Sequence, residues 1–167
     1  QIHSAPGHDP HSVILFEPAS RTLISADALW ESGFGVVFPE LEGESAFEEV
    51  GATLGLIESL KPLVVIPGHG KIFTNIGQAL ALARRRLEGF FADPRKHAVH
   101  ASKVLLKFKL LELNQAPLAE FVEWAAATHY FVLMHERWFS SVPLAKWTLD
   151  TIHDLERSGA IELRGDF

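Results

Sequence analysis

The chain has 167 residues, 47% of them hydrophobic and 22% charged, a balance typical of globular proteins and not of disordered ones. The net charge is -6 and the acidic excess lies mostly in residues 1–92, so the positive field that nucleic-acid phosphates require is missing. The absence of cysteine excludes disulfides and thiolate ligands, and the lack of a secretory signal or an apolar run of about 18 residues predicts a cytoplasmic protein with no membrane span.

Short apolar runs and turn residues alternate at the start of the chain. Residues 1–3 predict the end of a strand, and the runs at 12–16 and 22–25 predict a β-hairpin. Residues 30–43 hold several glycines and a proline without any period, which predicts an ordered loop.

Two helices and a buried strand are predicted next. Ser45 and Glu48 have the spacing of a capping box, and the apolar spacing behind them predicts an amphipathic helix over residues 46–60. The run at 63–66 predicts a buried strand, and residues 75–91 predict a second helix. This order of elements indicates half of an α/β sandwich, which leaves one face of its sheet uncovered.

The composition changes at residues 93–96, which predicts a linker and divides the chain into domains 1–92 and 93–167. The second domain is predicted to be mostly helical, with Gly159 ending its last helix. Its helices are expected at residues 97–113, 117–135 and 143–157, and a single short strand at 160–163.

Three segments place a metal-competent side chain at a turn after a predicted strand. They carry His8, Asp27 and His69, and glycine precedes each of the two histidines. Glycine lets the backbone turn tightly and present the imidazole. Neutral imidazole and carboxylate are common ligands of zinc, iron and manganese in hydrolases.

In their order and separation, Pro6-Gly7-His8, Ala26-Asp27 and Pro67-Gly68-His69-Gly70 resemble the second half of the metal site of the metallo-β-lactamase superfamily. The resemblance covers residues 1–92. It implies an α/β fold, the second half of an αββα metallo-β-lactamase sandwich followed by a mostly α-helical C-terminal subdomain. It also implies a metal-dependent hydrolase that uses metal-bound hydroxide on an ester, thioester, lactone or phosphodiester.

The resemblance implies a role for each of the three residues. His8 matches the third histidine of the first metal position, and His69 matches the last histidine of the second. Asp27 matches the catalytic carboxylate that bridges the two metals or binds the second. The implied cofactor is Zn²⁺, two ions per intact active site, with Fe or Mn as alternatives. The implied partner is a small-molecule substrate.

The sequence departs from the family's pattern in three places. Ala26 stands where glycine is usual, a mild change if the backbone angle suits alanine. His11 is unusual after the first turn and is not expected to be a ligand. The His-x-His-x-Asp-His segment that supplies the other ligands does not occur. We expect that segment upstream of Gln1, so that the chain is a fragment, inactive alone and able to exist without metal.

Ordinary structural roles are expected for the other histidines, which are His3, His11, His97, His100, His129, His135 and His153. Arg84, Arg85 and Arg86 are expected to form a solvated helix face, with phosphate binding as the alternative. The aromatic stretch at 30–38 either packs as a loop or forms part of a substrate-pocket wall.

The helical tail resembles the winged-helix-like appendage that some hydrolases of this superfamily carry. Its last helix has a net negative charge, so packing against the catalytic domain or a dimer contact is favoured over DNA reading. The alternative function is a non-catalytic interaction or nucleic-acid-binding module with a vestigial metal half-site. A homodimer formed through the uncovered sheet face is also an expectation.

Overall fold

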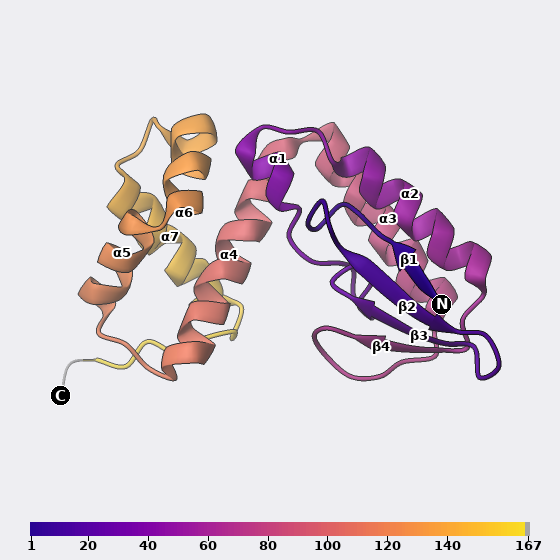
Figure 1. The fold of residues 1–167 in the computed structure, drawn as a ribbon. Coiled ribbons are helices and arrows are strands. Elements are labelled where there is room, and N and C mark those ends of the chain that lie inside the picture. Colours follow the sequence, from indigo (N-terminus) through magenta and orange to yellow (C-terminus); the bar gives the residue numbers. More distant parts are fainter. Residues whose placement is uncertain (166–167) are drawn as a thin grey trace. The chain divides into compact units, whose positions relative to one another are not determined.

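The computed structural model describes residues 1–165 and divides the chain into two compact units. The first unit is Gln1–Pro94 and carries the sheet, and the second begins at Arg95 and is built from helices (Figure 1). Within the described residues, no helix combines the length and the apolar composition needed to cross a membrane.

The first unit contains a four-stranded mixed sheet with strand order β1-β2-β3-β4. Its strands are β1 (Ile2–Ser4), β2 (Val13–Glu17), β3 (Thr22–Ala26) and β4 (Val64–Pro67). The first two pairs are antiparallel, and β3 and β4 run parallel. Strands β1, β3 and β4 therefore point the same way and end at the same edge of the sheet.

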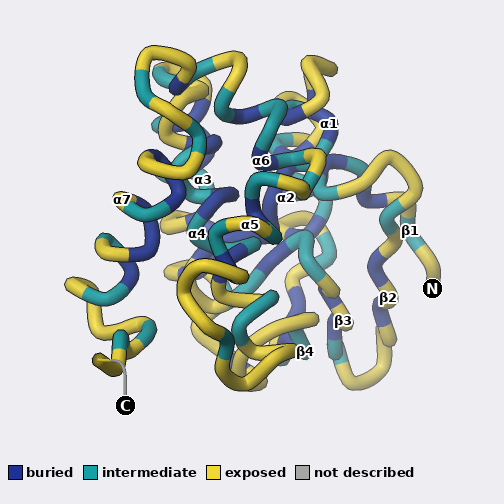
Figure 2. The backbone as a smooth tube through the Cα atoms, turned by 90° about the vertical axis from the view of Figure 1, so that its left-hand side faces the viewer, coloured by how far each residue is buried: buried dark blue, intermediate teal, exposed yellow. Residues whose placement is uncertain are grey.

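Burial alternates along β2 and β3, as the period of two along a strand requires (Figure 2). Ile14 and Leu23 are fully buried, whereas their neighbours Leu15 and Ile24 are 40% and 44% exposed. These exposed side chains form a row with the partly buried Ile66 across the sheet, because Ile2 pairs with Leu15, Leu15 with Ile24, and Ile24 with Ile66. One sheet face thus packs in the core, and the other presents apolar side chains to solvent.

Helices α2 (Phe47–Leu60) and α3 (Ile76–Ala92) lie against the buried face of the sheet (Figure 1). Their apolar residues recur at helical spacing and join the strand residues in one hydrophobic cluster. The buried helix residues of this cluster include Val50, Leu54, Ile57, Leu80, Ala83, Leu87 and Phe90. Both helices lie where the sequence predicts them.

Two expectations for the segment before α2 are wrong. Part of the predicted loop at 30–43 forms a short helix, α1 (Phe38–Glu42). It has a proline in its first turn, and Gly43 is its C-cap. The predicted capping box does not form, because the N-cap of α2 is Ala46, without a side-chain hydrogen bond. The Glu40 carboxylate instead accepts the backbone N–H groups of Ala46 and Phe47, at 2.7 and 3.0 Å.

The second unit contains only helices among its described residues. They are α4 (Pro94–Leu113), α5 (Leu118–Ala127), α6 (His129–Met134), the π-helix η1 (His135–Phe139) and α7 (Leu144–Arg157). The aromatic core includes Phe131, which is fully buried, and Trp147, which stacks on Phe139 with ring centroids 4.6 Å apart. The amphipathic last helix ends before Gly159, whose φ of 72° suits glycine.

The boundary between the two units falls inside the expected linker at 93–96, and the chain there is helical from Pro94, because proline fits the first turn of a helix. Two predictions for the second unit are wrong. The single helix expected over 117–135 breaks at Thr128, where the hydroxyl donates to the Trp124 carbonyl at 2.8 Å and the backbone is extended. Residues 160–163 are irregular and do not form a strand.

Candidate metal centre

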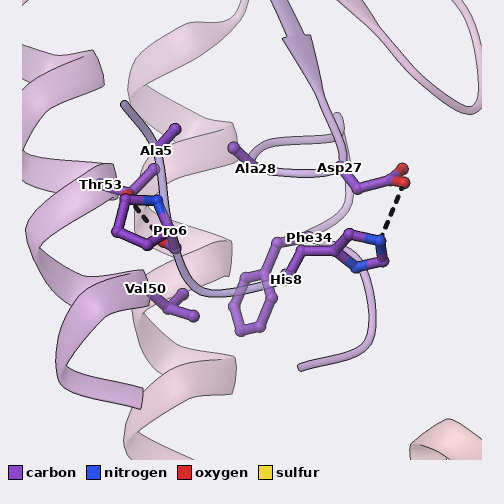
Figure 3. Close-up of a pocket in the computed structure, with 8 residues that line it drawn as sticks. All are labelled: Ala5, Pro6, His8, Asp27, Ala28, Phe34, Val50 and Thr53. Carbon is purple, nitrogen blue, oxygen red and sulfur yellow. Dashed lines mark hydrogen bonds and ion pairs between the residues drawn. The ribbon is translucent and has the colours of Figure 1, made fainter. Parts of the chain in front are cut away.

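The three candidate ligands meet at one edge of the sheet. His8 lies in the loop after β1, Asp27 directly follows β3, and His69 lies two residues beyond the end of β4. Since these strands run in the same direction, their ends bring together residues that are far apart in the sequence. His8 and Asp27 also line a pocket with Phe34 of the loop after β3 and with Val50 and Thr53 of α2 (Figure 3).

The Asp27 carboxylate lies between two imidazoles. His8 Nε2 lies 3.4 Å from Asp27 Oδ2 (Figure 3), and His69 Nε2 lies 3.7 Å from Asp27 Oδ1. Each imidazole faces a different oxygen. Two ligands of a tetrahedral zinc ion, each about 2.0–2.1 Å from the metal, are separated by roughly 3.3 Å. The His8 separation is close to this value, and the His69 separation is about 0.4 Å longer.

The orientation of His8 is fixed by a backbone carbonyl. His8 Nδ1 lies 2.6 Å from the Val36 oxygen, and because a carbonyl only accepts, Nδ1 carries a hydrogen and donates it. In the neutral ring, Nε2 then presents its lone pair to the carboxylate of Asp27. A lone pair and a carboxylate oxygen that face each other offer two donor atoms to a metal ion. Metal-binding histidines characteristically have such a partner on the other ring nitrogen.

Trp30 holds the other side of the carboxylate. Its indole Nε1 donates to Asp27 Oδ1 at 3.0 Å, and its ring meets the His69 ring edge-on, with centroids 5.4 Å apart. From the sequence, Trp30 is expected only to pack in a loop or to form part of a pocket wall. Its position three residues after Asp27, across a turn, is the signal that could have identified this role.

Two glycines pack directly against the candidate ligands. A β-carbon on Gly68 would lie 2.9 Å from Asp27 Oδ1. A β-carbon on Gly35 would lie 2.8 Å from His8 Nδ1 and 2.9 Å from the Asp27 β-carbon. Real β-carbon contacts are longer than this, so any side chain at these two positions would displace a candidate ligand.

Ala26 has a backbone conformation that favours glycine. Its φ is 45°, in the left-handed region, at a register irregularity of β3 against β4. The Ala26 carbonyl accepts the N–H of Gly68 at 2.8 Å, which ties the Asp27 turn to the His69 turn. The backbone angle therefore does not suit alanine, and the departure from glycine at this position is not a mild one.

Ala26→Gly should raise the free energy of unfolding by about 1 kcal/mol, because glycine relieves the left-handed strain at a smaller entropic cost. Urea denaturation of the two proteins measures the difference. Ala28→Gly is the matched control, since Ala28 is not among the residues with positive φ and the change there should destabilise the protein. Equal destabilisation by both changes would contradict the strain argument.

The described residues do not form a complete metal cluster. No group of three or more His, Asp or Glu side chains within residues 1–165 has an arrangement that could hold a metal ion by itself. Two histidines close to His8 in the sequence are not part of the site. His3 Nε2 is 3.3 Å from Gln1 Oε1, and His11 is exposed. The donor chemistry around Asp27 fits zinc, whereas the number of donors is too small for tight binding.

No protein-family model and no curated protein matches the chain. Among solved structures, the chain is similar to a metallo-beta-lactamase family protein from Thermus thermophilus, with a TM-score of 0.45 and 18% sequence identity. The match covers 99% of this chain and 46% of that protein. The chain thus spans less than half the length of the solved structure that it matches.

Proposed function

We propose that the protein is a metal-dependent hydrolase, with zinc as the favoured metal, and that its first unit carries the metal chemistry. The observation that carries the proposal is the Asp27 carboxylate, whose two oxygens face two different imidazoles at 3.4 and 3.7 Å. A carboxylate that presents one oxygen to each of two histidines is well placed to bridge two metal ions. Paired metal sites are common in hydrolases.

Each residue has a separate task in this proposal. His8 and His69 would each hold one metal ion, and Asp27 would bridge the two. The Val36 carbonyl fixes the ring of His8, and the Trp30 indole fixes the Asp27 carboxylate. The bound metal would supply an activated water, because it lowers the pKa of water to about 7. The proposed substrate is a small-molecule ester, thioester, lactone or phosphodiester.

The proposal requires further ligands beyond the described residues 1–165. Within residues 1–165, the only side chains that reach the Asp27 carboxylate through a hydrogen bond or an ion pair are His8, His69 and Trp30. A hydrolytic zinc site generally has three protein ligands or more. We therefore expect weak metal binding and no hydrolysis by this chain alone.

The test measures metal content by elemental mass spectrometry in the protein expressed from its complete natural gene. We expect bound zinc in the natural protein and loss of about half of it in each of His8→Ala and His69→Ala, since each histidine is assigned to a different ion. His11→Ala is the matched control, an exposed histidine of the same loop as His8, and should keep all of the metal. A folded natural protein without metal would overturn the proposal and leave a non-catalytic interaction module.

A further inference from the structure

The three consecutive arginines of α3 have different surroundings. Arg84 forms a two-pronged ion pair with Glu58, at 3.1 and 2.7 Å, and Arg85 is exposed. Arg86 is half-buried. Among the described residues, its guanidinium has neither a carboxylate within 4.0 Å nor a hydrogen bond. Only Arg86 therefore lacks both a partner and full access to water.

The Arg86 guanidinium lies against the turn that adjoins the candidate metal centre. A β-carbon on Gly33 would meet Arg86 Nη1 and would lie 2.6 Å from Cζ, so the absence of a side chain at Gly33 makes room for the guanidinium. Gly33 pairs with Trp30, whose N–H donates to the Gly33 carbonyl at 2.6 Å. Trp30 in turn donates to Asp27. A single short turn thus contacts both the guanidinium and the carboxylate of the candidate centre.

An unpaired charge in this position is costly. Burial lowers the pKa of Arg86, and no neighbouring acid opposes the effect. Arginines remove this cost by forming two parallel hydrogen bonds to a carboxylate or a phosphate. The first unit has many acidic residues, and none of those that the structure describes forms an ion pair with the Arg86 guanidinium. The missing partner is most simply an anion that comes from solution.

We propose that Arg86, at the Trp30–Gly33 turn, binds an oxyanion group of the substrate, either phosphate or carboxylate. The inference rests on the proposed function, because it assigns the charged group of the substrate to the turn that adjoins the proposed metal centre. It narrows the substrate class to small molecules with a negatively charged group. Neutral esters and lactones would be poor substrates.

The test is an NMR titration of this chain with inorganic phosphate and, in a separate arm, with acetate. EDTA is present throughout, so that no metal contributes to binding. We expect saturable shifts of the Arg86 Nε–H signal and of the Gly33 amide. Arg86→Gln should weaken phosphate binding about tenfold or more, because it removes a charge-assisted pair of hydrogen bonds. Arg85→Gln is the matched control, with the same charge change one residue away, and should leave the affinity unchanged.

Equal phosphate affinity in Arg86→Gln and Arg85→Gln would overturn the inference. If Arg86→Gln does not fold, the titration of the wild-type protein still tests the inference. An Arg86 Nε–H signal that shifts with neither phosphate nor acetate would also overturn it. Tighter binding of phosphate than of acetate would identify a phosphate-containing substrate, and the reverse would identify a carboxylate. Because the titration is metal-free, it gives its answer even if the natural protein proves to contain no metal.

Discussion

Asp27→Asn should remove nearly all bound metal from the natural protein and lower its rate of hydrolysis by at least about 100-fold, since the loss of a partner that only orients a ligand already costs 10–100-fold. Asparagine is neutral and cannot bridge two cations. Its amide oxygen can still accept the hydrogen bond from Trp30. We therefore expect little change in the melting temperature. Elemental mass spectrometry and thermal unfolding measure the two effects.

Asp9→Asn is the matched control for this experiment. Asp9 is an exposed aspartate in the loop that carries His8, and its carboxylate accepts only the backbone N–H of His11 among the interactions of the described residues. The two changes remove the same charge, so a general electrostatic effect would lower the metal content of both proteins equally. Metal retention in Asp27→Asn would contradict the bridging role of Asp27.

Acid should destabilise the helical unit through His97. Burial, and secondarily the nearby His100, lowers the pKa of the 1%-exposed His97 from 6.5 to about 3. The unfolded chain then binds one more proton than the folded chain between pH 6.5 and 3, so stability falls as the pH falls through this range. At pH 4.5 the loss is about 2–3 kcal/mol. Urea denaturation followed by tryptophan fluorescence reports it.

His97→Gln should flatten this pH dependence, because glutamine does not titrate. The control is His153→Gln, at an exposed histidine of α7, which should leave the slope as it is in the wild type. The comparison is made between the slopes of stability against pH, so a loss of stability in His97→Gln that is the same at every pH does not affect it. An unchanged slope in His97→Gln would mean that another group is responsible.

Local patterns predicted most of the regular structure. Apolar residues that alternate along a strand predicted the hairpin, and apolar residues spaced three and four apart predicted α2, α3 and α7. Both patterns depend only on neighbouring residues. The predictions failed where the apolar pattern does not decide the outcome. The N-terminus of α2 binds Glu40 of another helix instead of its own capping box. At Thr128 the backbone becomes extended and the hydroxyl donates to the Trp124 carbonyl, a local break that no apolar period reveals.

The candidate site was predicted in the same partial way. Glycine-flanked histidines and an aspartate after strands indicated His8, Asp27 and His69, and the structure brings all three together. Their function as metal ligands stays a prediction. The supporting groups could not be predicted, because the Val36 carbonyl and the Trp30 indole reach the site through the path of an irregular loop. The partnerless state of Arg86 likewise depends on which acids lie near it in space.

The two glycines that touch the candidate ligands have a consequence for comparing chains of this kind. Gly35 and Gly68 have no side chain that could bind a metal, yet they set how closely the backbone approaches His8 and Asp27. A related chain could keep both histidines and the aspartate and still lose the site through a single valine or serine at either glycine. Two chains with identical ligand motifs could then differ in metal binding because of these two positions alone.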